Sequence, residues 1–221
     1  MDLLYGLPVL FFSIVVHEIA HGWVALKLGD TTARDAGRIT FNPFPHIDIL
    51  GSVMIPLISY IAAGTIFIAW AKPVPINPNN FKKFRRDDIL VSAAGPVSNL
   101  IMAILCTVFF VASVYFVKMV LQPSKEIMAD FVFFIIKMFA AGITLNIFLA
   151  VFNLIPIPPL DGSHILSSLL PGKIGDAYRR TGFLGILIII ALFRIEPVRN
   201  FLFFVISIIN TPLNLLIGYL I

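Results

Sequence analysis

Two histidines and a glutamate stand together in the first apolar run of the sequence, as His17-Glu18-Ile19-Ala20-His21. If this run is helical, the four-residue spacing places both imidazoles on one face, and Glu18 lies about 100° round the helix from His17. Two imidazoles on one face can bind a single metal ion, and the carboxylate beside them can act as a base toward water on that ion. Histidines that merely bond to neighbouring helices would not require a glutamate in this position. The motif therefore predicts a hydrolytic metal site.

A hydrolytic zinc site takes three protein ligands and leaves one position open, so a third ligand is needed from elsewhere in the chain. Asp161 is the strongest candidate, because it follows a long apolar stretch and lies in the proline-rich segment 153–162. Three prolines in that segment interrupt the helix and allow Asp161 to turn toward the histidines. Asp161 could also cap a helix over residues 162–170, since Asp is a preferred N-cap residue. The two roles are compatible, and we predict Asp161 as the third ligand.

The composition places these polar residues in a membrane. Of the 221 residues, 59% are hydrophobic and 13% are charged, whereas a soluble domain carries about 25% charged residues. The 16 lysines and arginines are dispersed through loops, so nucleic-acid binding is not expected. The single cysteine, Cys106, excludes a disulfide within the chain and a cysteine-based metal site. We predict an all-α polytopic membrane protein in contact with the lipid bilayer.

About five to six membrane segments are predicted from the apolar runs. Segment 183–193 is too short to span unaided, since a spanning helix needs about 20 residues. With no repeat and no long linker, residues 1–221 form a single membrane-embedded domain, with a core over 3–170 and C-terminal helices over 181–221. Residues 37–43 combine β-branched and aromatic residues between turn residues, which predicts a short β-hairpin-like element after the first segment. The apolar runs cover residues 3–26, 49–71, 89–117, 131–155, 183–193 and 201–221.

Three motifs occur in a fixed order along the chain: His17-Glu18-x-x-His21, then Gly95-Pro96-Val97-Ser98-Asn99, then Asn153-x-x-Pro156-x-x-x-Leu160-Asp161-Gly162. Together they resemble the site-2 protease family of intramembrane zinc metalloproteases, in its minimal form without PDZ or CBS domains. The resemblance covers about residues 3–170. One departure is the apolar and basic insertion over residues 49–88, where the family's simplest members keep a short β region, so substrate access could follow another route.

The resemblance implies one Zn²⁺ per chain on His17, His21 and Asp161, with Glu18 as the catalytic base. It implies hydrolysis of a peptide bond in or near a transmembrane segment of a membrane-spanning substrate protein, that is, regulated intramembrane proteolysis. It also implies that Asn153 holds the substrate backbone beside the metal. Asn99, which would pack the core helices around the metal, is a further candidate for substrate binding.

Two other functions remain as alternatives at this point. Intramembrane His and Asp residues also mark the pathways of metal-ion transporters, although transporters commonly show repeated halves and a string of polar residues. A catalytically inactive relative that binds a membrane partner is the second alternative. The intact set of Glu18, two histidines and Asp161 favours an enzyme over both. The oligomeric state is left open.

Segment 49–71 has the length of a span, but we predict that it enters the membrane and returns. His21 and Asp161 meet most easily if the segments before them run parallel, which needs an odd number of crossings in between. If segment 49–71 crosses, Lys and Arg divide 8 to 8 between the two sides, whereas a return gives 11 to 5. The second arrangement puts the active site nearer the cytoplasmic face of what we expect to be a prokaryotic cell membrane, with a true span as the alternative.

Overall fold

The computed structural model describes residues 3–54, 57–58, 61, 71–120, 126–182 and 184–220, and long helices dominate it. The four long helices are α1 (Leu3–Lys27), α4 (Phe84–Val120), α5 (Glu126–Asn153) and α9 (Glu196–Leu220). Four shorter α-helices are α2 (Thr32–Asp35), α6 (Asp161–Leu169), α7 (Gly172–Arg179) and α8 (Leu184–Arg194). Three single-turn elements complete the described chain: η1 (Phe44–His46), η2 (Ile49–Met54) and η3 (Pro78–Asn80).

Four helices are long and apolar enough to cross a membrane, so the prediction of five to six segments is wrong for the described residues. These helices are Tyr5–Lys27 in α1, Phe84–Met119 in α4, Asp130–Asn153 in α5, and α9. The C-terminal apolar run 183–193 corresponds to α8, whose 11 residues reach only about 16 Å, roughly half of a bilayer's hydrocarbon core. Much of segment 49–71 lies outside the described residues, and its longest described helix is the single turn η2.

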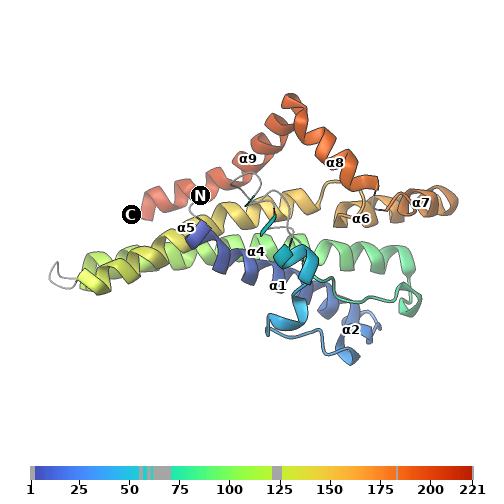
Figure 1. The fold of residues 1–221 in the computed structure, drawn as a ribbon, viewed down its shortest axis with the longest axis horizontal. Helices are drawn as coiled ribbons and strands as arrows, with labels where there is room; N and C mark the ends of the chain where they lie inside the picture. The colour runs from blue at the N-terminus through green and yellow to red at the C-terminus, as the bar shows by residue number, and fades with distance from the viewer. Residues whose placement is uncertain are drawn as a thin grey trace.

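The two ends of segment 49–71 lie side by side. The backbone N–H of Lys72 donates to the carbonyl of His46 over 2.9 Å, and the Arg38 guanidinium donates to the Lys72 carbonyl over 2.7 Å. A single crossing would separate the two ends by about 30 Å of hydrocarbon. The residues that flank the segment therefore lie at the same end of the helix bundle. In Figure 1, α1 and α5 accordingly run in the same direction, and α4 runs in the opposite one.

The β-hairpin-like element predicted over residues 37–43 is also wrong, because this stretch forms turns and bends, and no strand occurs in the described part of the chain. Its backbone groups are used locally instead. The N–H of Arg38 donates to Ala33, the N–H of Asn42 to the Thr40 hydroxyl, and the N–H of Phe44 to the Asn42 side chain. Such short-range bonds compete with a strand ladder.

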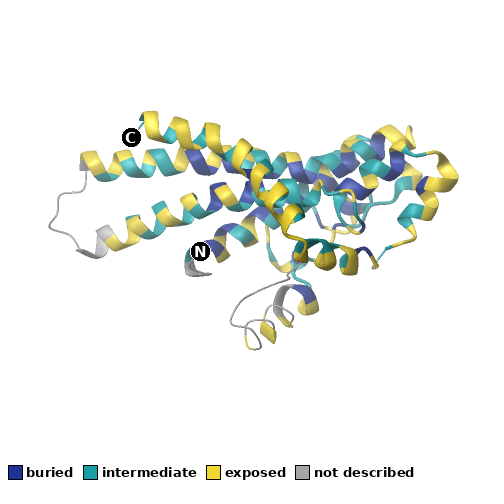
Figure 2. Ribbon diagram, turned by 90° about the horizontal axis from the view of Figure 1, so that it is seen from above, coloured by how far each residue is buried: buried dark blue, intermediate teal, exposed yellow. Residues whose placement is uncertain are grey.

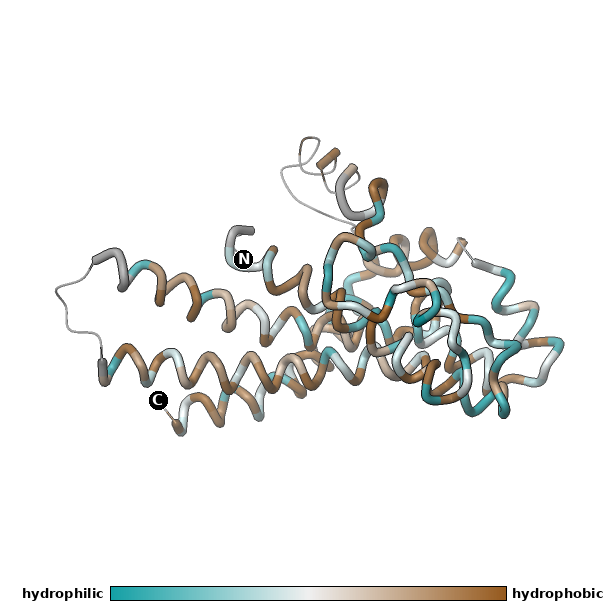
Figure 3. The backbone as a smooth tube through the Cα atoms, turned by 90° about the horizontal axis from the view of Figure 1, so that it is seen from below, coloured by the Kyte–Doolittle hydropathy of each residue, from teal (hydrophilic) through white to brown (hydrophobic). Residues whose placement is uncertain are grey.

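The bundle of long helices has two halves along its length, and the two differ in character. In one half an apolar cluster joins α1, α4, α5 and α9 through Val9, Ala103, Cys106, Ile143, Ile147 and Ile206. In the other half α2, α6 and α7 gather where α1 and α5 end and α4 begins (Figure 1). Figure 2 shows that the helices become more deeply buried toward this second half. Figure 3 shows that hydrophilic residues are concentrated in this second half, while the parts of the long helices farthest from it are mostly hydrophobic.

Candidate metal centre

Three potential metal ligands meet in the polar half of the molecule. His17 and His21 project from the same face of α1, and Asp161 is the first residue of α6. The Nε2 atoms of the two histidines lie 3.1 Å apart. Asp161 approaches both rings, with Oδ2 at 3.1 Å from His17 Nε2 and Oδ1 at 3.3 Å from His21 Nε2. The ligand atoms of the three residues lie within 4.8 Å of one another.

The other nitrogen of each histidine ring is bound from α4. His21 Nδ1 lies 2.7 Å from the Val91 carbonyl, which can only accept, so this nitrogen carries the ring proton. His17 Nδ1 lies 2.9 Å from Asn99 Oδ1 and donates to it in the same way. With a proton on each Nδ1, each Nε2 presents a lone pair to the shared space. A hydrogen bond from the second nitrogen fixes the tautomer and the orientation of a metal-binding histidine.

The ligand atoms converge closely enough to bind one zinc ion. Zinc bonds of about 2.1 Å at tetrahedral angles place ligand atoms about 3.4 Å apart. The two Nε2 atoms lie 3.1 Å apart, and Asp161 brings one oxygen to 3.1 Å from His17 Nε2 and its other oxygen to 3.3 Å from His21 Nε2. Asp161 Oδ2 is buried without a hydrogen-bond donor in the described part of the chain. Two neutral imidazoles and a carboxylate that turn lone pairs toward one point provide the donor set of a divalent cation.

Gly95 on α4 makes this arrangement sterically possible. A Cβ atom on Gly95 would meet both imidazole rings, at 2.5 Å from Nε2 of His17 and closer still to Nε2 of His21. Gly95 is named from the sequence only as part of a family motif, and its contact with the histidines is not predicted there. The adjacent Pro96 lies inside α4, which begins at Phe84.

The connection between α5 and α6 turns Asp161 toward α1. Helix α5 ends at Asn153, and Leu160 in extended conformation precedes α6, so Asp161 occupies the first helical turn and is not the N-cap residue. Gly162 lies against the Leu154 carbonyl, where a Cβ atom would clash. Aspartate binds a metal ion as the carboxylate.

Glu18, the predicted base, is held by a segment that sequence reasoning had not connected with the site. Its Oε2 atom accepts a hydrogen bond from the backbone N–H of Val74 over 2.7 Å. Val74 follows segment 49–71 and lies between two prolines in a stretch without regular secondary structure. Because this hydrogen bond comes from a backbone N–H, the residue type at position 74 gives no sign of it in the sequence.

The two asparagines named from the sequence lie in different environments. Asn99 is fully buried and contacts His17, so it sits directly behind a candidate ligand. Asn153 is partly buried at the end of α5, and its amide donates to the Leu149 carbonyl over 2.9 Å. Substrate binding by either residue stays a prediction.

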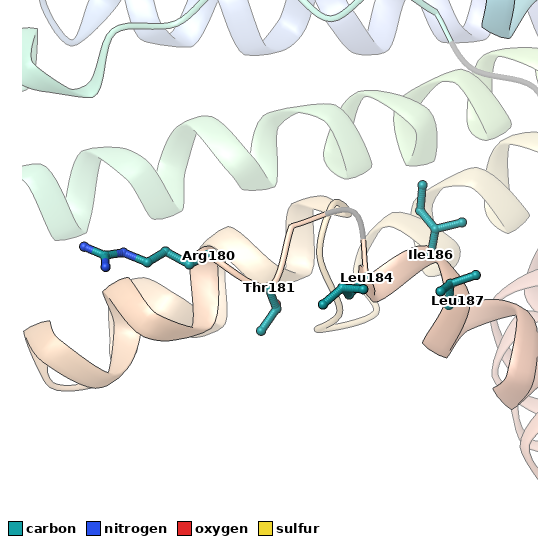
Figure 4. Close-up of a pocket in the computed structure, with 5 residues that line it drawn as sticks. All are labelled: Arg180, Thr181, Leu184, Ile186 and Leu187. Carbon is teal, nitrogen blue, oxygen red and sulfur yellow. The ribbon is translucent and has the colours of Figure 1, made fainter.

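A separate shallow hollow lies at the corner between α7 and α8. It is lined by Arg180, Thr181, Leu184, Ile186 and Leu187. Figure 4 shows the Arg180 side chain extending away from the three apolar residues. The Thr181 hydroxyl donates to the Tyr178 carbonyl, and none of the three candidate metal ligands lines this hollow, so it is not part of the metal centre.

Apolar helices that surround a two-histidine, one-aspartate site are typical of a membrane metallohydrolase. The profile of peptidase family M50 matches residues 5–193, and the chain belongs to this family, the site-2 protease family. It is 36% identical over 197 residues to the Bacillus subtilis protein named "Putative zinc metalloprotease YwhC", with 89% of this chain and 83% of that protein covered. The protein is thus a site-2 protease-like metalloprotease and an integral membrane protein.

Two further relatives carry names of the same form. Rip2 of Mycolicibacterium smegmatis is 27% identical over 196 residues, which cover 87% of this chain and 67% of the relative. MJ0611 of Methanocaldococcus jannaschii is 27% identical over 156 residues, which cover 70% of this chain and 64% of the relative. No solved structure matches the chain.

Proposed function

We propose that this protein is an intramembrane zinc metalloprotease that hydrolyses a peptide bond in or near a transmembrane segment of a substrate protein. The observation that carries the proposal is the convergence of His17, His21 and Asp161, with Glu18 next to His17 in α1. These three residues would hold the ion. When bound, zinc lowers the pKa of a coordinated water and polarises a carbonyl oxygen.

The residues of this chain have distinct roles in the proposal. Glu18 accepts a proton from the water that attacks the scissile carbonyl and returns it to the leaving nitrogen. Asn99 holds His17 through Nδ1, which is a positioning role. Asn153, near the α5–α6 connection that carries Asp161, holds the substrate backbone, so Asn153→Ala should lower turnover while zinc stays bound.

The experiment is a paired measurement of zinc content and cleavage on detergent-purified protein, with a panel of tagged single-span membrane proteins as substrates. Wild-type protein should contain one zinc per chain and cleave at least one substrate. Glu18→Gln should keep the zinc and lose cleavage, because it removes the base and not a ligand. Asp161→Ala should lose zinc and cleavage together, since two histidines form an incomplete site.

The outcomes separate the alternatives raised by the sequence. Zinc without cleavage in the wild type, together with zinc uptake into vesicles, would identify a transporter. Absence of both would leave an inactive relative. Cleavage that survives in Glu18→Gln would refute the proposed mechanism.

We also propose that the metal centre lies nearer the cytoplasmic face of a prokaryotic cell membrane. Many basic residues gather at this end of the bundle, where Lys27 ends α1, four cations surround the start of α4 and Arg179 lies in α7, and cytoplasmic loops carry the excess of Lys and Arg. Single cysteines at exposed Ala36 and Asn79, in a Cys106→Ala background, should both react with an impermeant thiol reagent only after cells are opened. Labelling of either position in intact cells would reverse the orientation.

A further inference from the structure

An extended segment over residues 72–77 runs along the C-terminal part of α1 and is tied down at three places; we call it the strap. At one end the N–H of Lys72 donates to the His46 carbonyl over 2.9 Å. In the middle the N–H of Val74 donates to Glu18 Oε2 over 2.7 Å. At the other end the N–H of Asn77 donates to Asp30 Oδ2 over 2.7 Å.

The sequence of the strap explains why it holds this shape. Lys72, Val74 and Asn77 each precede a proline. A residue before proline is restricted to extended backbone, and proline itself offers no N–H. The strap therefore has four N–H donors, and three of them make the ties just described. The fourth, of Ile76, has no hydrogen-bond partner among the described residues.

Both ends of the strap are anchored by buried charged side chains. Asp30 is fully buried at the end of α1 and also accepts from the side-chain amide of Asn80 over 2.7 Å. Arg38, only 8% exposed, donates to the Lys72 carbonyl over 2.7 Å. Its Nε is buried without a partner, and within the described chain it forms no ion pair. Burial of a guanidinium without an ion pair is costly, and the hydrogen bond to the Lys72 carbonyl offsets part of that cost.

The middle of the strap is pressed against the metal-binding helix. A Cβ atom on Gly22, the residue after His21, would lie 3.0 Å from Val74 Cγ1 and 3.3 Å from Ile39 Cγ1. The Val74 side chain is buried in this contact. Its N–H thus reaches Glu18 from a fixed position. The other carboxylate oxygen, Oε1, has no hydrogen-bond partner within the part of the chain that the structure describes.

We propose that the strap is a positioning device for Glu18: the Val74 N–H fixes Oε2, and Oε1 is thereby left as the oxygen that accepts the proton in hydrolysis. The inference rests on the proposed function, in which Glu18 is the base. Val74 and Arg38 are positioning residues, because neither touches the reacting atoms. A carboxylate with one fixed oxygen loses less rotational freedom at the moment of reaction than an unrestrained one.

The direct test is Val74→Pro, which removes the N–H. The expected result is a fall of about 10- to 100-fold in kcat, the range that loss of a hydrogen bond to a charged group spans, with zinc content unchanged and KM within about threefold. Kinetics would use the best-cleaved single-span substrate of the wild-type protein.

Two controls isolate the N–H donor. Val74→Ala keeps the donor and the ties at Lys72 and Asn77 but removes the buried side chain, so it should lower thermal stability and reduce kcat far less than Val74→Pro does. Ile76→Pro makes the same substitution two residues along the strap, where the lost N–H has no partner in the described structure, and kcat should again be retained. Wild-type kcat in zinc-loaded Val74→Pro, or an equal loss in Val74→Ala, would overturn the proposal.

A second pair of variants decides the question if Val74→Pro fails to retain zinc. Arg38→Gln loosens the strap at a distance from Glu18 and should lower kcat while zinc remains, whereas Arg38→Lys, which can still donate to the Lys72 carbonyl, should restore most of the activity. Equal kcat in both variants would overturn the proposal. Failure of the proposed function is distinguishable, because wild-type protein would then lack zinc or Glu18→Gln would remain active.

Discussion

The two halves of the helix bundle are held together by different interactions. In the apolar half, α1, α4, α5 and α9 meet through aliphatic side chains such as Val9, Ile143 and Ile147. In the half that contains the metal centre, buried polar groups link elements far apart in sequence, as in the bond from His17 to Asn99. Dispersion contacts dominate helix association in a bilayer, while each buried polar group needs a specific partner. The apolar half therefore supplies a scaffold, and the polar half fixes geometry.

Each half contains a glycine at a close contact between the long helices, and these two glycines allow a direct comparison. Gly95 of α4 faces the imidazoles of His17 and His21 in the polar half. Gly142 of α5 lies in the apolar half, where an added Cβ atom would be 2.7 Å from Cys106 Sγ and 2.9 Å from Val9 Cγ2. An added methyl group would thus disturb the arrangement of the metal-binding histidines in one half and the apolar packing in the other.

The largest effect is expected for Gly95→Ala. The new methyl group would displace the histidine rings from Asn99 and Val91, so their Nε2 atoms would no longer converge with Asp161. Loss of such supporting contacts costs about 10- to 100-fold in metal affinity. Zinc affinity by competition with a chromogenic chelator measures the effect. Wild-type affinity in this variant would show that the rings adapt and that Gly95 serves only helix packing.

Gly142→Ala should give the complementary result. Overpacking of a core typically costs about 1–3 kcal/mol, partly offset by the better helix propensity of alanine, which is worth about 1 kcal/mol. We expect a lower midpoint of thermal unfolding in detergent and unchanged zinc affinity. A loss of zinc affinity as large as that of Gly95→Ala would mean that the two halves are mechanically coupled, and the comparison would fail.

The features readable from the sequence are those that side-chain chemistry and helical spacing determine. The spacing of His17 and His21 fixes a shared face of any helix, and the prolines before Asp161 mark the only acidic residue that follows an interrupted apolar helix. Gly95 and Val74 were not assigned because they act through a missing side chain and a backbone N–H. The count of five to six membrane segments was wrong because the apolar runs 49–71 and 183–193 were included in it. Helix α8 is only 11 residues long, and the residues that flank 49–71, His46 and Lys72, are hydrogen-bonded to each other.

The smallest effect is expected at the outer edge of the polar half, where α6 is fastened to α4 and α7. Asp88 of α4, nearly fully buried, accepts from Arg179 of α7 over 2.8 Å and from the Ser168 hydroxyl of α6. Arg179 also donates to Ser167 over 2.8 Å. Since α6 begins with Asp161, this network holds the helix that presents the third ligand.

Asp88→Asn should weaken that hold without touching a ligand. Asn keeps the shape and one acceptor oxygen but removes the charge that pairs with Arg179, so α6 gains freedom at its far end. Because Asp88 acts one step further from the metal than Asn99 does, we expect zinc release to a chelator to accelerate by less than tenfold.

The matched control is Asp87→Asn, which alters the neighbouring carboxylate. Asp87 accepts from the Lys83 N–H and pairs with Arg86, and all three residues lie around the start of α4. This control should leave zinc release unchanged, because none of its contacts reaches α6. Equal rates in the two variants would assign the effect to the start of α4 as a whole and remove the network from the support of Asp161.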